Sequence, residues 1–330
     1  IEVIIEEEDF RGGFIEEKNR MDPDKFVNQE YSNFGRNMSL LNSFLLPLNP
    51  QTADHIDREL SQNKGEPLLQ NLADTKLFKK LLKFLDQKDD SGESLFKGQI
   101  KDSNGLLIKS NSNIKSFAEG QVQNTTKEIT NYIGKDGKKR AAYLLKFSLH
   151  PDHKKIRSNK YGKKILKQSK RFNIDPAIAM AVTETESSFN PKATSHIPAY
   201  GLMQLVPSSG GRDAYKYVYG EDKFLGKRYL YKPNNNIELG CAYLGKIRHQ
   251  YFKGIKDDEK ALICTVAAYN TGVGNVARAL TNSTKLSPTI KKVNSMSSAT
   301  LYKTLLKDLK HAETRNYLKK VWERKEKYNL

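Results

Sequence analysis

The segment that decides the fold is ETESSFNPKATSHIPAYGLMQLVP, residues 184–207. It follows the apolar run AIAMAV at residues 177–182, which Asp175 and Pro176 introduce. Aspartate is a favoured N-cap and proline is favoured in the first helical turn, so the pattern predicts a helix that runs to about Ser187. Because this helix is apolar on nearly all sides at its start, we expect it to be buried in a core.

Glu186 is the candidate catalytic residue at the end of that helix. It lies four residues after Val182 and eight after Ile178, so it continues their apolar stripe. Burial raises the pKa of a glutamate towards neutrality, which would allow Glu186 to donate a proton near pH 7. Periodicity alone favours a structural role, in which a helix-terminal glutamate caps the helix or pairs with a lysine. Glu184 lies on the opposite side of the helix, so the two carboxylates cannot face one substrate.

Several groups of residues occur in an order that resembles one enzyme family. Residues 186–207 resemble the ESxFxPxAxS…GLMQxxP signature of the goose-lysozyme-like (SLT) lytic transglycosylases. The motifs AYNTG at residues 268–272 and ETRNY at residues 313–317 follow in the family's order, and residues 236–244, between the first signature and AYNTG, resemble its scaffold helix. Each piece alone would be read as an ordinary turn or helix end. Their joint occurrence in order makes the resemblance specific.

The resemblance implies a lysozyme-like, all-α domain that cleaves peptidoglycan with a single glutamate. Most glycosidases use two carboxylates. In this family one glutamate, here Glu186, protonates the glycosidic oxygen between N-acetylmuramic acid and N-acetylglucosamine. It then acts as base for the C6 hydroxyl, which closes onto C1 as a 1,6-anhydro sugar. Acid–base catalysis contributes about 10² to 10⁴ in rate, so oriented polar groups and substrate distortion must supply the rest. No cofactor and no metal are implied.

The resemblance also assigns substrate-binding roles to polar and aromatic side chains. Tyr269 and Asn270 would line the cleft beside the N-acetyl group. Gln204 and Ser195 would form hydrogen bonds with sugar substituents. Tyr317 would help to hold the catalytic glutamate.

Other residues either support the expected site or depart from the family. Ser187, Met203 and Glu313 are expected to support it, Ser187 by securing local structure. Val206 stands where relatives often carry a methionine, and HIPAY at residues 196–200 replaces a loop of small residues. We expect these departures to alter the shape of the glycan subsite and to leave the chemistry unchanged.

The chain is long enough for two domains, and its patterning changes near residue 153. We predict an α+β protein in which a smaller mixed α/β domain precedes the all-α catalytic domain at residues 153–330. Residues 1–90 are a poorly assigned N-terminal segment with one amphipathic helix, and residues 91–152 form the remainder of the mixed α/β domain. Residues 94–153 resemble, less completely, the α/β domain that precedes the catalytic part in some members of the family.

Local patterns predict individual elements on both sides of that boundary. Before it we expect an amphipathic helix at 74–87, a hairpin turn at Asn104-Gly105, a helix within 113–133 and a strand at 143–149. After it, helices are predicted at 154–170, 175–187, 236–251, 259–270, 300–309 and 312–328.

The net charge of +18 is unevenly spread, since residues 1–17 carry seven acids and one base. A basic body would attract a polyanion such as nucleic acid, anionic lipid or a cell wall bearing peptide carboxylates, although a lysine-rich proteome explains it equally well. No nucleic-acid motif accompanies the charge, so no nucleic-acid partner is expected. Cys241 and Cys264 lack the spacing of a zinc site, and we expect buried thiols in preference to a disulfide.

Two alternative functions stay open on the sequence. A goose-type lysozyme hydrolase would deliver water to C1 on the same fold, and a non-catalytic peptidoglycan- or polyanion-binding protein would keep the fold and its charge. A wall-degrading enzyme acts outside the cytoplasm, so we expect a periplasmic monomer whose partner is the peptidoglycan glycan strand. No run of 18 apolar residues appears, and the start at Ile1 suggests a removed leader. An outer-membrane lipid anchor on that removed segment is implied only by the resemblance.

Overall fold

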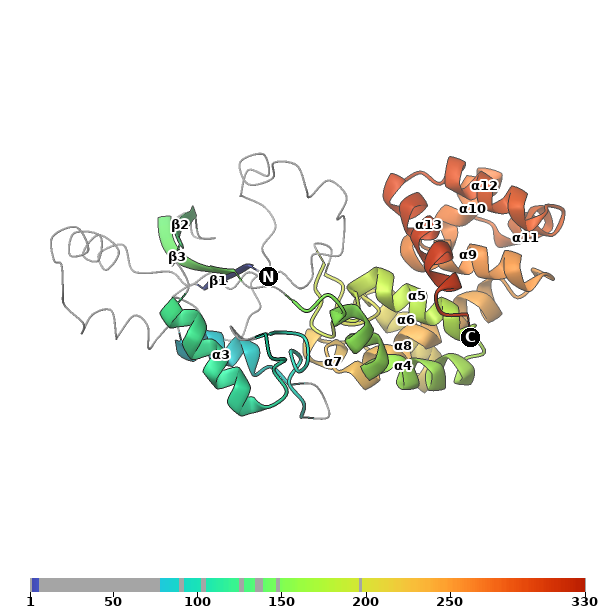
Figure 1. Ribbon diagram of the computed structural model, residues 1–330. Coiled ribbons are helices and arrows are strands. Elements are labelled where there is room, and N and C mark those ends of the chain that lie inside the picture. Colours follow the sequence, from blue (N-terminus) through green and yellow to red (C-terminus); the bar gives the residue numbers. More distant parts are fainter. Residues whose placement is uncertain are drawn as a thin grey trace. The chain divides into compact units, whose positions relative to one another are not determined.

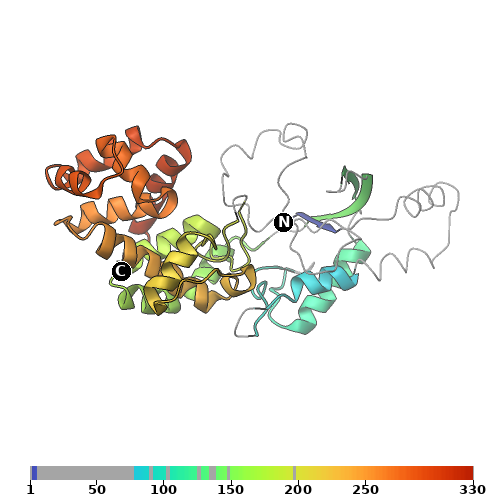
Figure 2. The ribbon, with the colours of Figure 1, turned by 180° about the vertical axis from the view of Figure 1, so that it is seen from behind.

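The computed structural model divides the chain into two compact units, Ile1–Ile156 and Arg157–Leu330, which are described separately. Figure 1 and Figure 2 show their elements from opposite sides. The residues that the structure describes are 2–5, 78–88, 92–101, 105–124, 128–133, 139–146, 149–195 and 198–329.

The first unit contains a three-stranded antiparallel sheet in the order β1-β3-β2. The strands are β1 (Glu2–Ile5), β2 (Glu128–Ile133) and β3 (Lys139–Lys146). The central strand β3 overlaps the strand expected at 143–149 over residues 143–146 and begins before it, at Lys139. Residues 147 and 148 lie outside the described residues. The helix expected within 113–133 is α3 (Asn111–Asn124), and the end of that range is β2.

The described core of the first unit is built from helical and extended segments on either side of a turn. Residues 78–85 are helical, within the range expected for the amphipathic helix, and Leu81 and Leu85 are fully buried there. They share a hydrophobic cluster with Ile100 and Ile108. The backbone N–H of Ile108 donates to the carbonyl of Ile100 at 2.9 Å, which pairs the two sides of the expected hairpin. Residues 74–77 of the expected helix and residues 102–104 of the expected turn lie outside the described residues.

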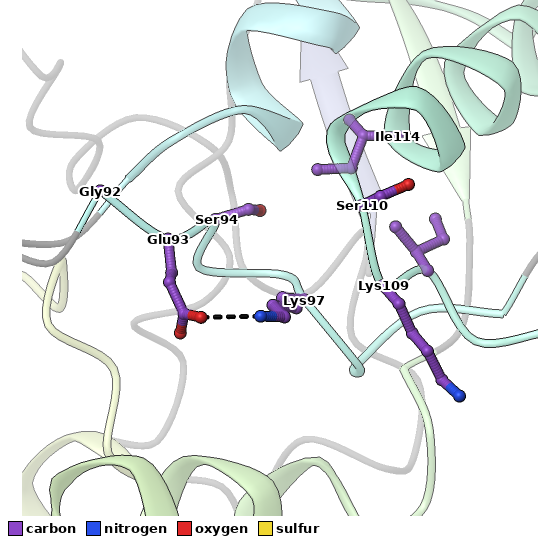
Figure 3. Close-up of a pocket in the computed structure, with 8 residues that line it drawn as sticks. Gly92, Glu93, Ser94, Lys97, Lys109, Ser110 and Ile114 are labelled. Carbon is purple, nitrogen blue, oxygen red and sulfur yellow. Dashed lines mark hydrogen bonds and ion pairs between the residues drawn. The ribbon is translucent and has the colours of Figure 1, made fainter.

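A small pocket of about 170 Å³ lies in the first unit beside the start of α3 (Figure 3). Several of its polar lining side chains have partners within the chain. Lys97 forms an ion pair with Glu93 at 2.7 Å, and the Ser94 hydroxyl donates to the carbonyl of Leu85 at 3.0 Å. The Ser110 hydroxyl accepts from the backbone N–H of Asn113, as an N-cap does. None of the residues expected at the active site lines this pocket.

Every named element in the described part of the second unit is helical, which confirms the helical character expected for residues 153–330. The helices are α4 (His153–Arg171), α5 (Pro176–Ser187), α6 (Gly210–Tyr219), α7 (Lys227–Leu230), α8 (Pro233–Lys246), the π-helical turn η3 (Ile247–Tyr251), α9 (Asp258–Thr271), α10 (Val273–Thr281), α11 (Leu286–Asn294), α12 (Ser298–Asp308) and α13 (Ala312–Glu326).

Helix α5 lies in the core of the second unit, as its composition predicts. Asp175 caps it, accepting a hydrogen bond from the N–H of Ala177 at 2.8 Å, and Pro176 occupies the first turn. Ile178 and Val182 are fully buried, and each such side chain contributes about 1.5–3 kcal/mol on transfer from water. Helix α13 packs along α5 and also against α9 (Figure 1). Helix α5 is thereby packed against an element from a distant part of the sequence.

Helices α6, α10 and α11 were not predicted from the sequence, for local reasons. Helix α6 opens on Gly210 and Gly211, which have poor helix propensity. Helix α10 starts immediately after Gly272, which the sequence suggested as a helix end. Helix α11 contains Pro288, which is tolerated because it falls in the first turn.

Cys241 on α8 and Cys264 on α9 are both free and buried, which confirms the preference for thiols over a disulfide. Desolvation raises the pKa of Cys264 to about 12 and that of Cys241 further still. Both are therefore neutral thiols that pack as small apolar side chains.

Candidate active site

The last turn of α5 carries Glu184, Thr185 and Glu186 in succession, and all three are buried. Glu186 is 8% exposed, in agreement with its place on the apolar stripe. Glu184 faces the end of α13, where Lys327 and Tyr328 bind its carboxylate. The two glutamates therefore have different surroundings, and Glu184 is already engaged within the protein.

The chain leaves α5 through two consecutive residues in the left-handed region. Ser188 has φ 50° and Phe189 has φ 59°, values that are uncommon for residues other than glycine. The Ser187 hydroxyl donates to the carbonyls of Thr183 at 3.2 Å and Leu202 at 2.7 Å. This bridge joins the helix carrying Glu186 to the GLMQ segment, in keeping with the supporting role expected of Ser187.

Asn236 on α8 fixes the GLMQ segment, residues 201–204. Its side-chain oxygen accepts from the N–H of Met203 at 2.7 Å, and its nitrogen donates to the carbonyls of Tyr200 and Leu230, each at 2.8 Å. Asn236 is fully buried, so all three bonds are shielded from water. The sequence identified residues 236–244 only as a scaffold helix and missed this role of Asn236.

Gln204 and Ser195 both belong to the folded loop that follows Glu186. The Gln204 nitrogen donates to the carbonyls of Ala193 at 3.0 Å and Gly201 at 2.9 Å. Because carbonyls only accept, this fixes which end of the amide faces the loop, and the amide oxygen remains the end suited to accept from a ligand. The Ser195 hydroxyl accepts from the N–H of Ala199 at 3.3 Å. Of the departing residues 196–200, His196 and Ile197 lie outside the described residues.

Tyr269 on α9 joins the GLMQ segment to the surroundings of Glu186. Its hydroxyl donates to the carbonyl of Met203 at 2.7 Å, and its ring lies 5.4 Å from that of Tyr243. Burial raises the pKa of Tyr269 well above its ordinary value, and the negative charge of Glu186 adds to the increase. Tyr269 therefore stays protonated and lies within electrostatic range of Glu186.

The other expected residues lie on the same helices but in different settings. Asn270 follows Tyr269 on α9 and is half-buried. Tyr317 on α13 is 3% exposed, on the helix that packs against α5. Glu313 is exposed in the first turn of α13, where a negative charge suits the helix dipole. The structure thus links Ser187 and Tyr269 to the GLMQ segment by hydrogen bonds and places Tyr269 within electrostatic range of Glu186, whereas Glu313 is exposed.

No group of three or more metal-ligating side chains occurs in the part of the chain that the structure describes. None of the helices described there is both long and apolar enough to cross a membrane.

Comparison with known proteins places this geometry in a family. Residues 163–291 match the transglycosylase SLT domain family. This part of the chain is an SLT domain. The match contains Glu186, the GLMQ segment, Asn236 and Tyr269, and it ends before α13.

Curated relatives of the SLT-domain chain are membrane-bound lytic murein transglycosylases C. The chain is 33% identical over 237 residues to that of Klebsiella pneumoniae, a match that covers 72% of this chain and 63% of the relative. It is 33% identical over 238 residues to that of Haemophilus influenzae, covering 71% and 63% respectively. The chain therefore spans less than two thirds of the length of these relatives.

Solved structures with similar chains include two lytic transglycosylases. The 70-kDa soluble lytic transglycosylase of Escherichia coli aligns with a TM-score of 0.39 and 25% identity over 51% of this chain and 24% of that one. An inactive mutant of the lytic transglycosylase Slt of Pseudomonas aeruginosa aligns with a TM-score of 0.39 and 26% identity over 50% and 23%.

Proposed function

We propose that the chain is a peptidoglycan lytic transglycosylase with a lysozyme-like catalytic domain, in which Glu186 is the single acid and base. The observation that carries the proposal is the separation of the two carboxylates. Glu186 is buried at the end of α5, and Glu184 is bound by Lys327 and Tyr328, which directly follow α13. A two-carboxylate mechanism needs a second free carboxylate across the glycosidic bond, and Glu184 does not supply one.

In the proposed reaction Glu186 protonates the glycosidic oxygen between N-acetylmuramic acid and N-acetylglucosamine as the bond to C1 breaks. The resulting carboxylate then removes the proton of the C6 hydroxyl, whose oxygen bonds to C1 and forms the 1,6-anhydro ring. Glu186 is protonated again at the end, so the cycle balances without water. Relatives named lytic murein transglycosylases support this reaction class.

The remaining residues bind and orient the sugar in this proposal. The amide oxygen of Gln204 accepts hydrogen bonds from sugar substituents, and the hydroxyl of Ser195 donates or accepts them. Asn270 presents its amide beside the N-acetyl group, next to Tyr269. Tyr317 holds the surroundings of Glu186 from α13, while Met203 and Glu313 support the site.

We further propose that the protein works as a periplasmic monomer on peptidoglycan strands and is held at the outer membrane by a lipid anchor. The name of the relatives, membrane-bound, supports an anchored location. In this proposal the unit before residue 153 is a mixed α/β domain, and the three-stranded sheet and α3 support that assignment.

Mass spectrometry of the products released from purified murein sacculi tests the function. We expect soluble muropeptides with 1,6-anhydro ends from the wild type. Glu186→Gln should lower their release by about 10² to 10⁴, the contribution of general acid–base catalysis. Glu259→Gln is the matched control, because Glu259 is an exposed carboxylate in the first turn of α9 and should leave the rate unchanged.

The same products separate the alternatives. Reducing ends in place of anhydro ends would make the protein a hydrolase. Binding to sacculi without any release by the wild type would make it a wall-binding protein, and the proposed function would be wrong.

A further inference from the structure

The end of α13 holds the turn of α5 that carries Glu186. Lys327 places its ammonium 3.2 Å from both oxygens of Glu184, and the Tyr328 hydroxyl donates to the same carboxylate at 2.7 Å. One residue nearer to Glu186, the hydroxyl of Thr185 accepts from the Arg324 guanidinium at 2.9 Å. These bonds connect positions that are 139 to 144 residues apart in sequence.

Tyr328 contacts the chain on both sides of Glu186. Its hydroxyl binds Glu184, two residues before the glutamate. Its ring packs edge-to-face against Phe189, three residues after it, with ring centroids 6.4 Å apart and an interplanar angle of 81°. Phe189 is fully buried and has left-handed backbone geometry, a strained conformation that persists only where surrounding contacts enforce it. One side chain therefore restrains both the helical turn and the strained exit from it.

The charges in this contact are fixed across the neutral range. Burial alone would raise the pKa of Glu184, but hydrogen bonds from Tyr328 and Lys327, with the charge of Arg324, lower it below its ordinary value of 4.5. Burial and the bond to Glu184 raise the pKa of Tyr328. Glu184 thus stays an acceptor and Tyr328 a donor wherever the proposed enzyme would work.

We propose that Arg324, Lys327 and Tyr328, here called the C-terminal clamp, are positioning residues that set the direction of the Glu186 carboxylate. This inference rests on the proposed catalytic role of Glu186. The clamp would not touch the sugar. It would act through Glu184, Thr185 and Phe189, which surround Glu186 in the sequence. Because all three clamp residues follow residue 291, the clamp lies outside the segment that matches the SLT family.

Steady-state kinetics on soluble, uncrosslinked glycan strands test the clamp. A misplacement of about 1 Å at a reacting group costs up to about 100-fold in rate, so we expect Tyr328→Ala to lower kcat by about 10- to 100-fold. KM should change by less than about threefold, because the sugar contacts are untouched. Tyr328→Phe keeps the ring and loses only the hydroxyl, and it should fall between the wild type and Tyr328→Ala.

A double-mutant cycle distinguishes positioning from general damage. Tyr328→Phe and Glu184→Gln remove two ends of one bond, so their combined effect on kcat should be clearly smaller than the product of the single effects. Lys319→Met is the matched control, since the Lys319 side chain is 61% exposed on α13, and kcat should not change. Multiplicative effects of Tyr328→Phe and Glu184→Gln on kcat, or an unchanged kcat in folded Tyr328→Ala, would overturn the inference.

Hydrogen exchange gives a readout that does not depend on catalysis. In Tyr328→Ala the amides of residues 187–189 should exchange at least about tenfold faster, while amides in α9 and α10 keep their rates. If the wild type releases no product, the proposed function fails, and the exchange experiment still decides whether the clamp holds the turn. If the wild type is active and neither kcat nor exchange responds, only the clamp inference fails.

Discussion

Two glycines near the site are required for different physical reasons. Gly201 has φ 81°, and a Cβ there would strike the Asn236 amide and the carbonyl of Leu230. Gly240 lies on α8 under Met203, whose sulfur and Cβ occupy the space that a Cβ would need. The first glycine allows the GLMQ segment to turn, and the second lets that segment approach α8.

Gly240→Ala is therefore expected to disturb both stability and the site. Overpacking of a filled core costs about 1–3 kcal/mol, and displacement of Met203 would carry Gln204 with it. We expect a lower free energy of unfolding by that amount in urea and a raised KM for glycan strands. Gly162→Ala, on α4, is the control, because a Cβ at this position would meet only the Met180 side chain, at an ordinary contact distance of 3.8 Å. That variant should gain about 0.4–1 kcal/mol. If Gly240→Ala and Gly162→Ala changed the free energy of unfolding in the same direction and by the same amount, this account would be wrong.

The sequence predicted the positions that follow from local spacing. Glu186 and Ser187 fall where helical periodicity puts them, and Asp175 caps the helix as expected. Asn236 was missed because its partners at Tyr200 and Met203 are 36 and 33 residues away, and only the folded chain brings them together. The orientation of Gln204 has the same cause, since it depends on a loop closed by tertiary contacts.

At the scale of elements, the contact between α5 and α13 should contribute stability that depends on pH. The pKa of Glu184 is lowered in the folded state from an ordinary value of 4.5. A lowered folded pKa means that the contribution is fully present above pH 4.5 and is lost as the pH falls through the folded value. Acid should therefore weaken this contact by protonating Glu184.

Glu184→Gln tests that dependence through the free energy of unfolding in urea. At pH 7 the variant should be less stable than the wild type by about 1–3 kcal/mol, because Lys327 and Tyr328 lose a charged acceptor. The difference should shrink as the pH is lowered below 4.5. Glu323→Gln, at a 61% exposed position on α13, should differ from the wild type by no more than about 0.5 kcal/mol. A difference between wild type and Glu184→Gln that stays constant into acid would argue against the ionised contact.

Element boundaries were predicted best where apolar periodicity is strong. Expected helices at 259–270 and 312–328 correspond to α9 (Asp258–Thr271) and α13 (Ala312–Glu326). The helix expected at 236–251 begins earlier, at Pro233, and continues as the π-helical turn η3 after Lys246. A π turn repeats the hydrogen bonds at a different spacing, which residue types alone do not reveal.

At the scale of the whole molecule, the second unit has a core of its own. Its buried cluster runs from Tyr161 and Ile165 on α4 to Val321 on α13. The change to helical periodicity near residue 153 predicted where α4 begins, at His153. Residues 1–73 carry polar and acidic stretches with little periodicity, so no element could be predicted there from the sequence.

A fragment of residues 153–330 is therefore expected to fold without the first unit. Its thermal unfolding should be a single cooperative transition, within about 5 °C of the corresponding transition in the full chain. The informative control is a fragment of residues 172–330, which lacks α4 and so removes the fully buried Ile165 and the nearly buried Tyr161. Loss of such large core side chains costs several kcal/mol, about 2–5 for each, which is comparable with the total stability of a domain. The shorter fragment should lack a cooperative transition in calorimetry. If both fragments showed the same thermal transition, α4 would not be part of the core. If neither fragment folded, the second unit would depend on the first for its stability.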